Sequence, residues 1–431
     1  MKIGRKVTVA LIALALLLAG CTSNNVDSVA EPVGNNEENK EVITLTYARG
    51  ADTTGTVDAL IKAFNEKHPH IQVEYLEMPN DTGAQHDHYV TTFSAQGTEI
   101  DIFSADIIWP AEFAQANYAL ELDRFIERDG VDLNTFFPGT VEAVTFKNRV
   151  WALPMLTDAG LLYYRKDIVE HPPSTWDELI ALAQAHQGQE ETEFGYVMQA
   201  NQYEGLICNA IEFIESYGGK VIDEDGKVVV NSPETIKGIE KMIEIANSFI
   251  VPSDIFSFKE TETENAFIEG KAVFARNWTY MQSMAANPEG SKVVDKVGFA
   301  LLPAGDAGSA ATLGGWVTMI NRYSKHPEEA WEFVKFVSSP EGQKISALIG
   351  GLAPTLPELY EDEEVKSVAT LFANEEFVAT LQNAVPRPVT PIYPRISDIM
   401  QIELSRALAG RISAEEATKN MQEKMENALA E

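Results

Sequence analysis

The stretch 42–75, VITLTYARGADTTGTVDALIKAFNEKHPHIQVEY, decides the fold class of this chain. Its first seven residues, 42–48, predict a strand. Apolar residues then recur at i, i+3, i+4 and i+7, the spacing of one helical face, at Val57, Leu60, Ile61 and Phe64. Pro69 ends that helix, and residues 71–75 alternate as a second strand. We therefore expect a β-α-β unit whose strands run parallel through a right-handed crossover.

The alternation of strands and helices continues along the chain, so the expected fold class is α/β. Residues 100–103 predict a third short strand, and residues 151–154 look like a crossing into a second unit. There is no fixed-period repeat of the kind that marks solenoids and propellers. A chain of 431 residues is expected to form two lobes. We expect lobe 1 to contain residues 42–152 with 301–352, and lobe 2 to contain residues 153–300 with 353–431.

The first 20 residues have the pattern of a secretion signal. Three basic residues precede an apolar run at 9–19, which is shorter than the ~20 residues of a membrane-spanning helix. Leu-Ala-Gly-Cys at 18–21 closely resembles the bacterial lipoprotein box. That resemblance implies cleavage before Cys21, attachment of lipid (palmitate) there, and anchoring on the extracytoplasmic face of the cell membrane. The alternative is ordinary signal cleavage nearby, with Cys21 incidental. Residues 21–41 are polar and predict a flexible tether.

The composition argues against several classes of function. Asp and Glu outnumber Lys and Arg by 65 to 33, giving a formal net charge of −32, which argues against nucleic-acid binding. With Cys21 lipidated, Cys208 has no partner for an intramolecular disulfide. Its apolar neighbours predict a buried structural thiol rather than a reactive nucleophile. The sequence has no phosphate loop and no Gly-x-Ser-x-Gly elbow, and we expect no cofactor.

The stretch Ala311-Thr312-Leu313-Gly314-Gly315-Trp316 is a candidate ligand-binding loop. Two adjacent glycines let the backbone approach a ligand closely. The indole that follows offers a flat apolar face with one N–H donor at its edge. This pairing suits a sugar, whose ring has apolar C–H faces and a rim of hydroxyls. The alternative is a tight turn before a strand, with the indole buried in the core.

Several stretches together resemble the solute-binding lipoproteins of carbohydrate ABC transporters (extracellular solute-binding protein family 1), especially the trehalose/maltose-type binding proteins. The stretches are 158–167, 202–206, 276–278, 309–316, 330–337 and 383–388. The likeness covers nearly all of residues 42–429. It implies a two-lobed periplasmic-binding-protein-like fold, with a hinge and the ligand in the cleft between the lobes. It also implies a monomer that captures a disaccharide or short oligosaccharide for a permease and does no chemistry on it.

The resemblance also implies which residues hold the sugar. They are Asp106, Asp158, Trp278, Tyr280, Gly315, Trp316, Arg387 and Tyr393, together with Asp81 and Thr82 in a lobe-1 loop that we expect to reach the cleft. Ionised carboxylates and a guanidinium make strong charge-assisted hydrogen bonds to hydroxyls, and the aromatic rings stack on or line the sugar. The alternatives are a helix cap or turn for the aspartates, core packing for the rings, and a surface ion pair for Arg387.

The chain departs from the trehalose/maltose-type pattern in three places. The small polar run 52–56 stands where an acidic ligand residue is usual. Leu156 stands where an aromatic residue is common, and residues 86–88 (His-Asp-His) occupy the region where arginines are frequent. These departures leave the sugar-binding role intact and leave the choice of disaccharide open.

Three other functions compete with sugar transport. A glycoside hydrolase also pairs carboxylates, but an aromatic cleft without a general acid in an apolar pocket suits binding equally, and we expect no enzyme. A metal site could recruit His68, His70, His86 and His88. No cysteine or regularly spaced acid completes such a site, so we expect solvated loop histidines and no metal. A surface sensor that presents the bound sugar to a signalling partner would use the same cleft as a transporter component.

Overall fold

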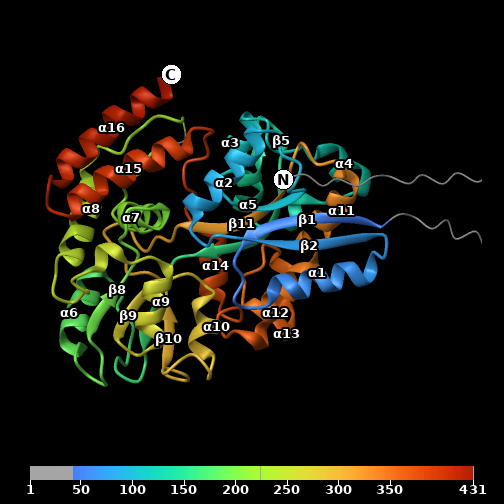
Figure 1. Cartoon of the computed structure of the whole chain (residues 1–431). Coiled ribbons are helices and arrows are strands. Elements are labelled where there is room, and N and C mark those ends of the chain that lie inside the picture. Colours follow the sequence, from blue (N-terminus) through green and yellow to red (C-terminus); the bar gives the residue numbers. More distant parts are fainter. Residues whose placement is uncertain (1–41, 224, 431) are drawn as a thin grey trace, which may run out of the picture. The chain divides into compact units, whose positions relative to one another are not determined.

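The computed structural model describes residues 42–223 and 225–430 (Figure 1). The predicted secretion signal, the lipidation site Cys21 and the tether therefore lie outside the described residues. Residues 42–431 form one compact unit by themselves. Within the described ranges, no helix is both long enough and apolar enough to span a bilayer.

The first sheet contains the predicted β-α-β unit. Strand β1 (Ile43–Gly50), helix α1 (Thr56–Lys67) and strand β2 (Ile71–Met78) follow one another, and the two strands pair in parallel along their full length. The sheet has the order β2-β1-β3-β11-β6, in which β3 (Ile102–Asp106) is parallel to β1 while β11 (Leu313–Ile320) and β6 (Leu153–Ala159) run antiparallel to their neighbours. The parallel unit predicted from apolar periodicity is confirmed. We call the part of the chain built on this sheet lobe 1.

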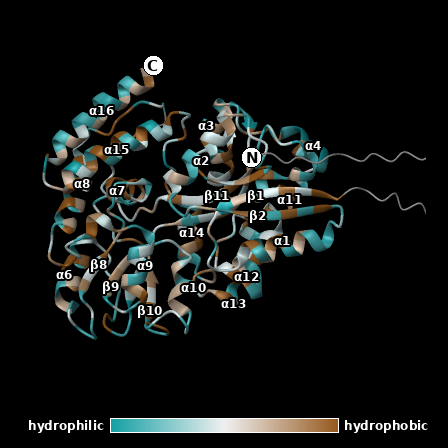
Figure 2. Cartoon of the chain, viewed as in Figure 1, coloured by the Kyte–Doolittle hydropathy of each residue, from teal (hydrophilic) through white to brown (hydrophobic). Residues whose placement is uncertain are grey.

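Helices cover both faces of the first sheet. On one face, α1 and α11 (Pro327–Ser338) pack on Tyr47, with Phe64 and Phe333 in edge contact. On the other face, α2 (Thr82–Ser94) and α3 (Pro110–Gln115) pack on Phe103. Burial of these rings is the main source of stability for lobe 1, since each buried aromatic removes a large apolar area from water. The helices in Figure 2 alternate between brown and teal, as expected of elements with one buried face.

The second sheet has four strands and carries most of the remaining chain, which we call lobe 2. Its order is β10-β7-β9-β8, formed by β10 (Val297–Ala300), β7 (Leu161–Arg165), β9 (Ala272–Asn277) and β8 (Phe194–Val197). The helices around it are α6 (Trp176–His186), α7 (Glu204–Ser216), α8 (Pro233–Ala246), α9 (Glu260–Ile268), α15 (Tyr393–Leu408) and α16 (Ala414–Ala430). Together the two sheets show the two-lobed α/β fold that the sequence predicts.

The remaining elements are short. They are α4 (Asp123–Asp129), η1 (Leu133–Thr135), α5 (Pro138–Val144), β4 (Thr145–Phe146), β5 (Arg149–Val150), η2 (Ile255–Ser257), α10 (Met281–Ala286), α12 (Pro340–Gly350), η3 (Pro357–Glu361), α13 (Glu363–Val368) and α14 (Glu375–Asn383).

The chain crosses between the sheets three times. It passes from β6 to β7 at Gly160, from β10 to β11 through residues 301–312, and from α14 to α15 through residues 384–392. The predicted boundary placed residue 153 at the start of lobe 2, whereas the hydrogen bonds of β6 to β11 hold residues 153–159 in the first sheet. The exact division of the chain into lobes stays a proposal.

Two local predictions differ from the structure. The expected loop at 311–316 is largely strand, because β11 begins at Leu313 and pairs on both sides. His86 and His88 lie on helix α2 rather than in a solvated loop, and the side chain of His86 is only 16% exposed. In α2 the buried positions include polar Gln85 and Thr92, so apolar periodicity does not reveal the helix.

Candidate functional site

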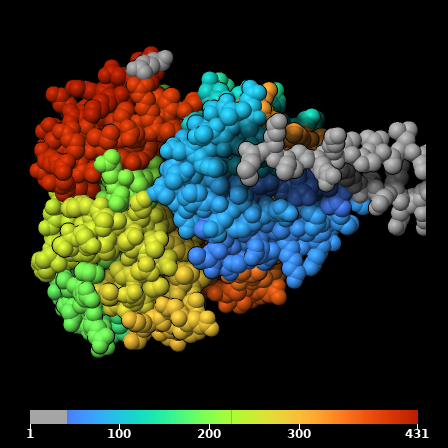
Figure 3. Space-filling view, in the orientation of Figure 1, coloured from blue at the N-terminus to red at the C-terminus, as the bar shows by residue number. Residues whose placement is uncertain are grey.

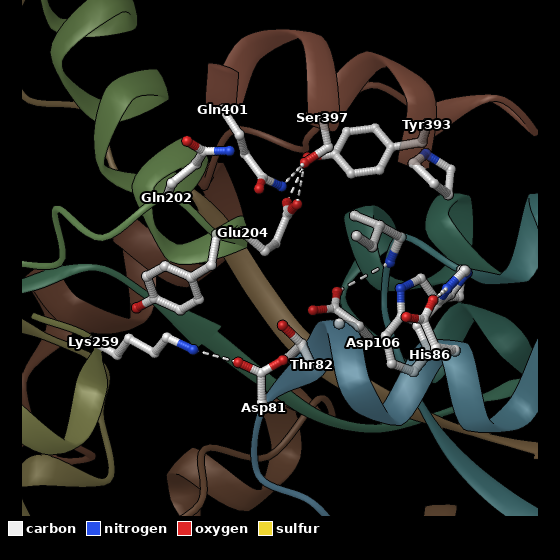
Figure 4. Close-up of a pocket in the computed structure, with 16 residues that line it drawn as sticks. Asp81, Thr82, His86, Asp106, Gln202, Glu204, Lys259, Tyr393, Ser397 and Gln401 are labelled. Carbon is white, nitrogen blue, oxygen red and sulfur yellow. Dashed lines mark hydrogen bonds and ion pairs between the residues drawn. The ribbon is translucent and has the colours of Figure 1, made fainter. Parts of the chain in front are cut away.

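A cavity of about 290 Å³ lies between the two lobes (Figure 4). Its volume is at the lower end of the range typical of small-molecule sites. Its lining consists of Asp81, Thr82, Gly83, His86, Asp87, Asp106, Ile108 and Trp109 from lobe 1, and Gln202, Tyr203, Glu204, Lys259, Tyr393, Pro394, Ser397 and Gln401 from lobe 2. In Figure 3 the blue surface of lobe 1 meets the red and yellow surfaces of lobe 2 along one seam.

The lobe-1 wall is formed by the start of α2 and the end of β3. Asp81 is the N-cap of α2, and its Oδ1 accepts a hydrogen bond from the backbone N–H of Ala84 at 2.9 Å. Asp106 is the last residue of β3, at the carboxyl end of a parallel strand, where ligands of open α/β sheets commonly bind. Trp109 follows it with its indole almost fully buried. This wall therefore offers two carboxylates beside an aromatic surface.

The lobe-2 wall is organised around Glu204, the first residue of α7. Its Oε1 accepts a hydrogen bond from the Tyr393 hydroxyl at 2.6 Å, and its Oε2 accepts one from Ser397 Oγ at 2.5 Å. A carboxylate at a helix N-terminus also interacts favourably with the helix dipole. Glu204 thus fixes the start of α15 against the start of α7, as the dashed lines of Figure 4 show in part.

Arg387 lies behind the cavity and connects its two walls. The residue is 4% exposed and sits on the third crossing between the lobes. Its Nη2 donates to Asp106 Oδ1 at 2.7 Å, and its Nη1 donates to Glu204 Oε1 at 2.8 Å. Burial alone would lower the pKa of Arg387, but the two carboxylates raise it well above its ordinary value. A permanently charged guanidinium therefore holds one carboxylate from each lobe.

A second ion pair joins the lobes at the cavity wall. Lys259, the N-cap residue of α9, donates to Asp81 Oδ2 and lies 5.1 Å from the centroid of the Tyr203 ring. The hydrogen bond from Lys259 lowers the pKa of Asp81 below its ordinary value. Both side chains are about 40% exposed, at 36% for Lys259 and 40% for Asp81, so water screens the pair and its net contribution to stability is small.

The sequence-predicted residues fall into two neighbouring groups. Asp81, Thr82, Asp106 and Tyr393 line the cavity, and Arg387 contacts the lining residue Asp106. The other predicted residues do not line this cavity; they are Asp158, Trp278, Tyr280, Gly315 and Trp316.

Two contacts connect this second group to the cavity. Trp316 pairs with Asp106 in the sheet register and its ring lies 5.9 Å from that of Trp109, centroid to centroid. Glu260 accepts hydrogen bonds from Tyr203 and from Trp278 Nε1. The two groups are therefore contiguous.

Asp158 is the carboxyl of the second group, and its pKa is strongly shifted. Its Oδ1 accepts hydrogen bonds from the backbone N–H groups of Thr279 at 2.9 Å and of Ala159 at 3.0 Å. Burial raises the pKa of Asp158 to about 6, although these hydrogen bonds act in the opposite direction. A carboxylate held beside a hinge crossing and poised near neutral pH is typical of functional rather than purely structural positions.

The second group also contains two aromatic residues, Trp278 and Tyr280, which lie on the chain segment after β9. The Arg276 guanidinium lies 3.9 Å above the centroid of the Trp278 ring, which is a cation–π contact. Burial, followed by the neighbouring carboxyl of Glu264, raises the pKa of Tyr280 well above its ordinary value. Both rings stay partly exposed and so keep surface for a ligand.

Close packing within the protein explains why residues 314 and 315 are glycines. Gly315 has φ = +138°, and a Cβ there would lie 2.6 Å from the carbonyl oxygen of Leu156 on β6. A Cβ on Gly314 would lie 2.8 Å from the Trp278 ring. The glycines let β11 pass close to β6 and to Trp278, and the register slips immediately after them, between Trp316 and Val317.

Sequence reasoning missed Glu204, Lys259, Ser397 and His86. Glu204 stands in the stretch 202–206 that carried the resemblance, yet its partners Arg387 and Tyr393 lie 183 and 189 residues away. Such pairings depend on tertiary structure, so no local pattern predicts them. The one signal in the sequence is an acidic residue at the start of a helix. Such a residue is as typical of a stabilising helix terminus as of a ligand-binding site.

The fold and the cavity define a class of protein. Two α/β lobes joined by crossing segments, with a polar and aromatic cavity between them, are the arrangement of proteins that hold a small solute between hinged lobes. The comparisons with known proteins agree. Residues 50–344 match the model of the family described as bacterial extracellular solute-binding protein. The chain belongs to that family, and its kinship with carbohydrate ABC transporter binding proteins is confirmed.

Individual relatives are binding proteins of ABC transporters or proteins with a bound sugar. A probable ABC transporter-binding protein of Deinococcus radiodurans is 33% identical over 364 residues, which are 81% of this chain and 85% of that protein. The maltose-bound MalE3 structure of T. maritima has a TM-score of 0.84 and 36% identity, covering 90% of this chain and all of that one. A Thermotoga lettingae solute-binding protein bound to α-D-tagatose has a TM-score of 0.78 and 26% identity, covering 89% of this chain and 100% of that one.

The names of the Deinococcus radiodurans and Thermotoga lettingae relatives describe binding proteins of ABC transporters. The chain is thus the substrate-binding component of an ABC sugar transporter, and membership of an extracellular family is typical of a protein that works outside the cytoplasm. The two solved structures hold different sugars, maltose and α-D-tagatose, so they support the class of ligand and not one sugar.

Proposed function

We propose that this protein captures an α-linked disaccharide or short oligosaccharide, of the maltose or trehalose type, and delivers it to a membrane permease. The observation that carries the proposal is the pairing of carboxylates and aromatic rings in one place between the lobes. Carboxylates accept hydrogen bonds from sugar hydroxyls, and the partly exposed ring of Tyr203 offers a face for the apolar C–H surfaces, beside the buried rings of Trp109 and Tyr393. The 36% identity with a maltose-bound protein supports the same substrate class.

The proposed ligand residues are those that the sequence predicts, extended by the structure. One end of the sugar contacts the cavity group Asp81, Thr82, Asp106 and Tyr393, with Arg387 holding Asp106 in place. The other end contacts the second group, formed by Asp158, Trp278, Tyr280, Gly315 and Trp316. The contiguity of the two groups through Trp316 and Glu260 supports a ligand longer than one ring.

The proposed mechanism is hinge closure. Contacts from both lobes form together only when the lobes approach, so the ligand shifts the population toward the closed form. The three crossings between the sheets supply the hinge. The closed form then docks on its permease as a monomer, and the proposed lipid on Cys21 keeps the protein at the extracytoplasmic face of the cell membrane. No step of this mechanism changes the bonds of the sugar.

A thermal-shift panel tests the substrate class. The protein from Val42 onward is heated with maltose, trehalose, maltotriose, sucrose, cellobiose or glucose. A ligand at 100 times its Kd adds about 2.7 kcal/mol to the stability of the folded state, which raises the melting temperature visibly. A rise with an α-linked disaccharide supports the proposal. No rise in the melting temperature with any of these six sugars would overturn the sugar assignment.

A further inference from the structure

His86 is an imidazole in the wall of the cavity that the transport function leaves without a role (Figure 4). Its Nε2 lies 2.7 Å from Glu112 Oε2 on α3, a hydrogen-bond distance. Its Nδ1 lies 3.7 Å from Asp87 Oδ1, which is too long for a hydrogen bond. The ring is flanked by Trp109 at 5.3 Å and Phe113 at 5.6 Å, centroid to centroid. The imidazole is therefore held in one orientation.

This orientation decides what each nitrogen does. Glu112 accepts a hydrogen bond from Nε2–H, so Nε2 carries a proton in both charge states. Protonation then changes Nδ1 alone, from an acceptor in the neutral ring to a donor in the charged ring. The Glu112 partner thus leaves one imidazole nitrogen available, and its hydrogen-bonding character depends on pH.

The charges around His86 favour its protonated form. The titratable groups near it are Asp87 on the same helix and Glu112 on α3, and the other titratable groups of the cavity are Asp81, Asp106, Tyr203, Glu204, Lys259 and Tyr393. Burial alone would lower the pKa of His86, but the carboxylates of Glu112 and Asp87 together outweigh burial and raise this pKa above its ordinary value. Lys259 is the cation of this set, and it is engaged by Asp81.

We propose that His86 is a further ligand-contacting residue, whose protonated ring donates a hydrogen bond from Nδ1 to a hydroxyl oxygen of the bound sugar, so that the protein holds its sugar more tightly at mildly acidic than at alkaline pH. This inference rests on the proposed function of the cavity. A hydroxyl can accept from the charged ring, and a charge-assisted hydrogen bond is stronger than one to the neutral ring. The alternative is a purely structural role, in which His86 only packs α2 against α3.

The matched variants are His86→Gln and His88→Gln. Glutamine at 86 keeps an amide donor for Glu112 but cannot become charged. His88 stands two residues away on the same helix with its side chain exposed, so His88→Gln removes an imidazole without touching the cavity. Sugar affinity is measured by titration calorimetry between pH 6.5 and 9.0, a range that begins above the pKa of about 6 to which burial raises Asp158.

We expect the affinity of the unaltered protein and of His88→Gln to fall about three- to tenfold from pH 6.5 to 9.0, as the charge assistance of one hydrogen bond is lost. His86→Gln should bind with a flat pH profile. Binding with the same pH profile in all three proteins would overturn the inference while leaving the proposed function intact. An absence of sugar binding at any pH in the unaltered protein would instead overturn the proposed function, and this inference with it.

A second measurement separates contact from a purely structural role. Linkage requires that a sugar which binds the protonated form more tightly also raises the titration midpoint of His86. For a tenfold affinity ratio, the Cε1–H resonance should titrate about one pH unit higher when the sugar is saturating. A midpoint that does not move on saturation would show that His86 senses no ligand and would overturn the inference.

Discussion

Substitution of Asp158 by asparagine should stabilise the fold and weaken sugar binding at the same time. Burial raises the pKa of this carboxyl from the ordinary 3.8 to about 6. Since the folded-state pKa is raised, the ionised form is disfavoured by folding. The free energy of unfolding therefore falls as the pH rises from about 4 through about 6. The asparagine variant has no such dependence at this position.

The size of the effect follows from the same pKa. A rise from 3.8 to about 6 corresponds to a cost of at most about 3 kcal/mol, reduced where solvent reaches the partly exposed carboxylate. The asparagine oxygen can still accept from the Thr279 and Ala159 N–H groups, so no buried donor is left unpaired. We expect Asp158→Asn to be more stable by about 1 to 3 kcal/mol at pH 7.5 and to match the unaltered protein near pH 4.

The assay is denaturant unfolding of both proteins at several pH values, together with calorimetry of sugar binding at pH 7.5. Loss of a charge-assisted hydrogen bond should weaken binding by about 10- to 100-fold. A stability difference that is the same at pH 4.5 and pH 7.5 would refute the reasoning, because a neutral side chain differs from the carboxylate only where the carboxylate is ionised. A variant destabilised at both pH values would show that the fold needs the second carboxylate oxygen.

Three further changes test the rest of the site. Arg387→Met should destabilise the protein by about 3 to 5 kcal/mol, since it leaves the carboxylates of Asp106 and Glu204 buried without their cation. Denaturant unfolding measures this loss of stability, and a loss below about 1 kcal/mol would contradict the prediction. Lys259→Met removes a screened ion pair, so the free energy of unfolding should fall by less than about 1 kcal/mol. The ligand-free protein should nevertheless have a larger radius of gyration in solution scattering. An unchanged scattering profile would show that the pair does not hold the lobes together. Trp316→Ala should weaken sugar binding about 30-fold or more, as expected for an aromatic anchor, without unfolding the protein; unchanged affinity would move the site away from β11.

The elements with strong local periodicity were predictable from the sequence. The parallel pair β1 and β2 followed from the apolar spacing of α1 and from alternation in β2. Asp106 was a candidate through the family resemblance, and the structure places it as the last residue of β3, where functional groups of α/β sheets gather. The α/β class followed from the same alternation, and the two lobes followed from the length of the chain and from a resemblance spread over nearly all of it.

The remainder depends on tertiary contacts that no local pattern carries. The α2 helix was missed because its buried face includes Gln85 and Thr92, so His86 was expected in a solvated loop. The role of Glu204 depends on Arg387, a residue 183 positions away. The Gly-Gly-Trp stretch predicted a loop, since glycines are common in turns. In the structure these glycines allow strand β11 to pass close to strand β6. Only the backbone positions of the two strands reveal this close approach.

Calorimetric titration with maltose, trehalose and cellobiose tests the central claim most directly. The three sugars contain the same two glucose units and differ in how these are linked, so a difference in affinity isolates the recognition of the linkage. The account predicts saturable one-to-one binding of maltose or trehalose and binding of cellobiose at least about 100-fold weaker, a difference of about 2.7 kcal/mol. Equal affinity for cellobiose, or no binding of either α-linked sugar, would contradict the claim that the cavity between the lobes is built for an α-linked disaccharide.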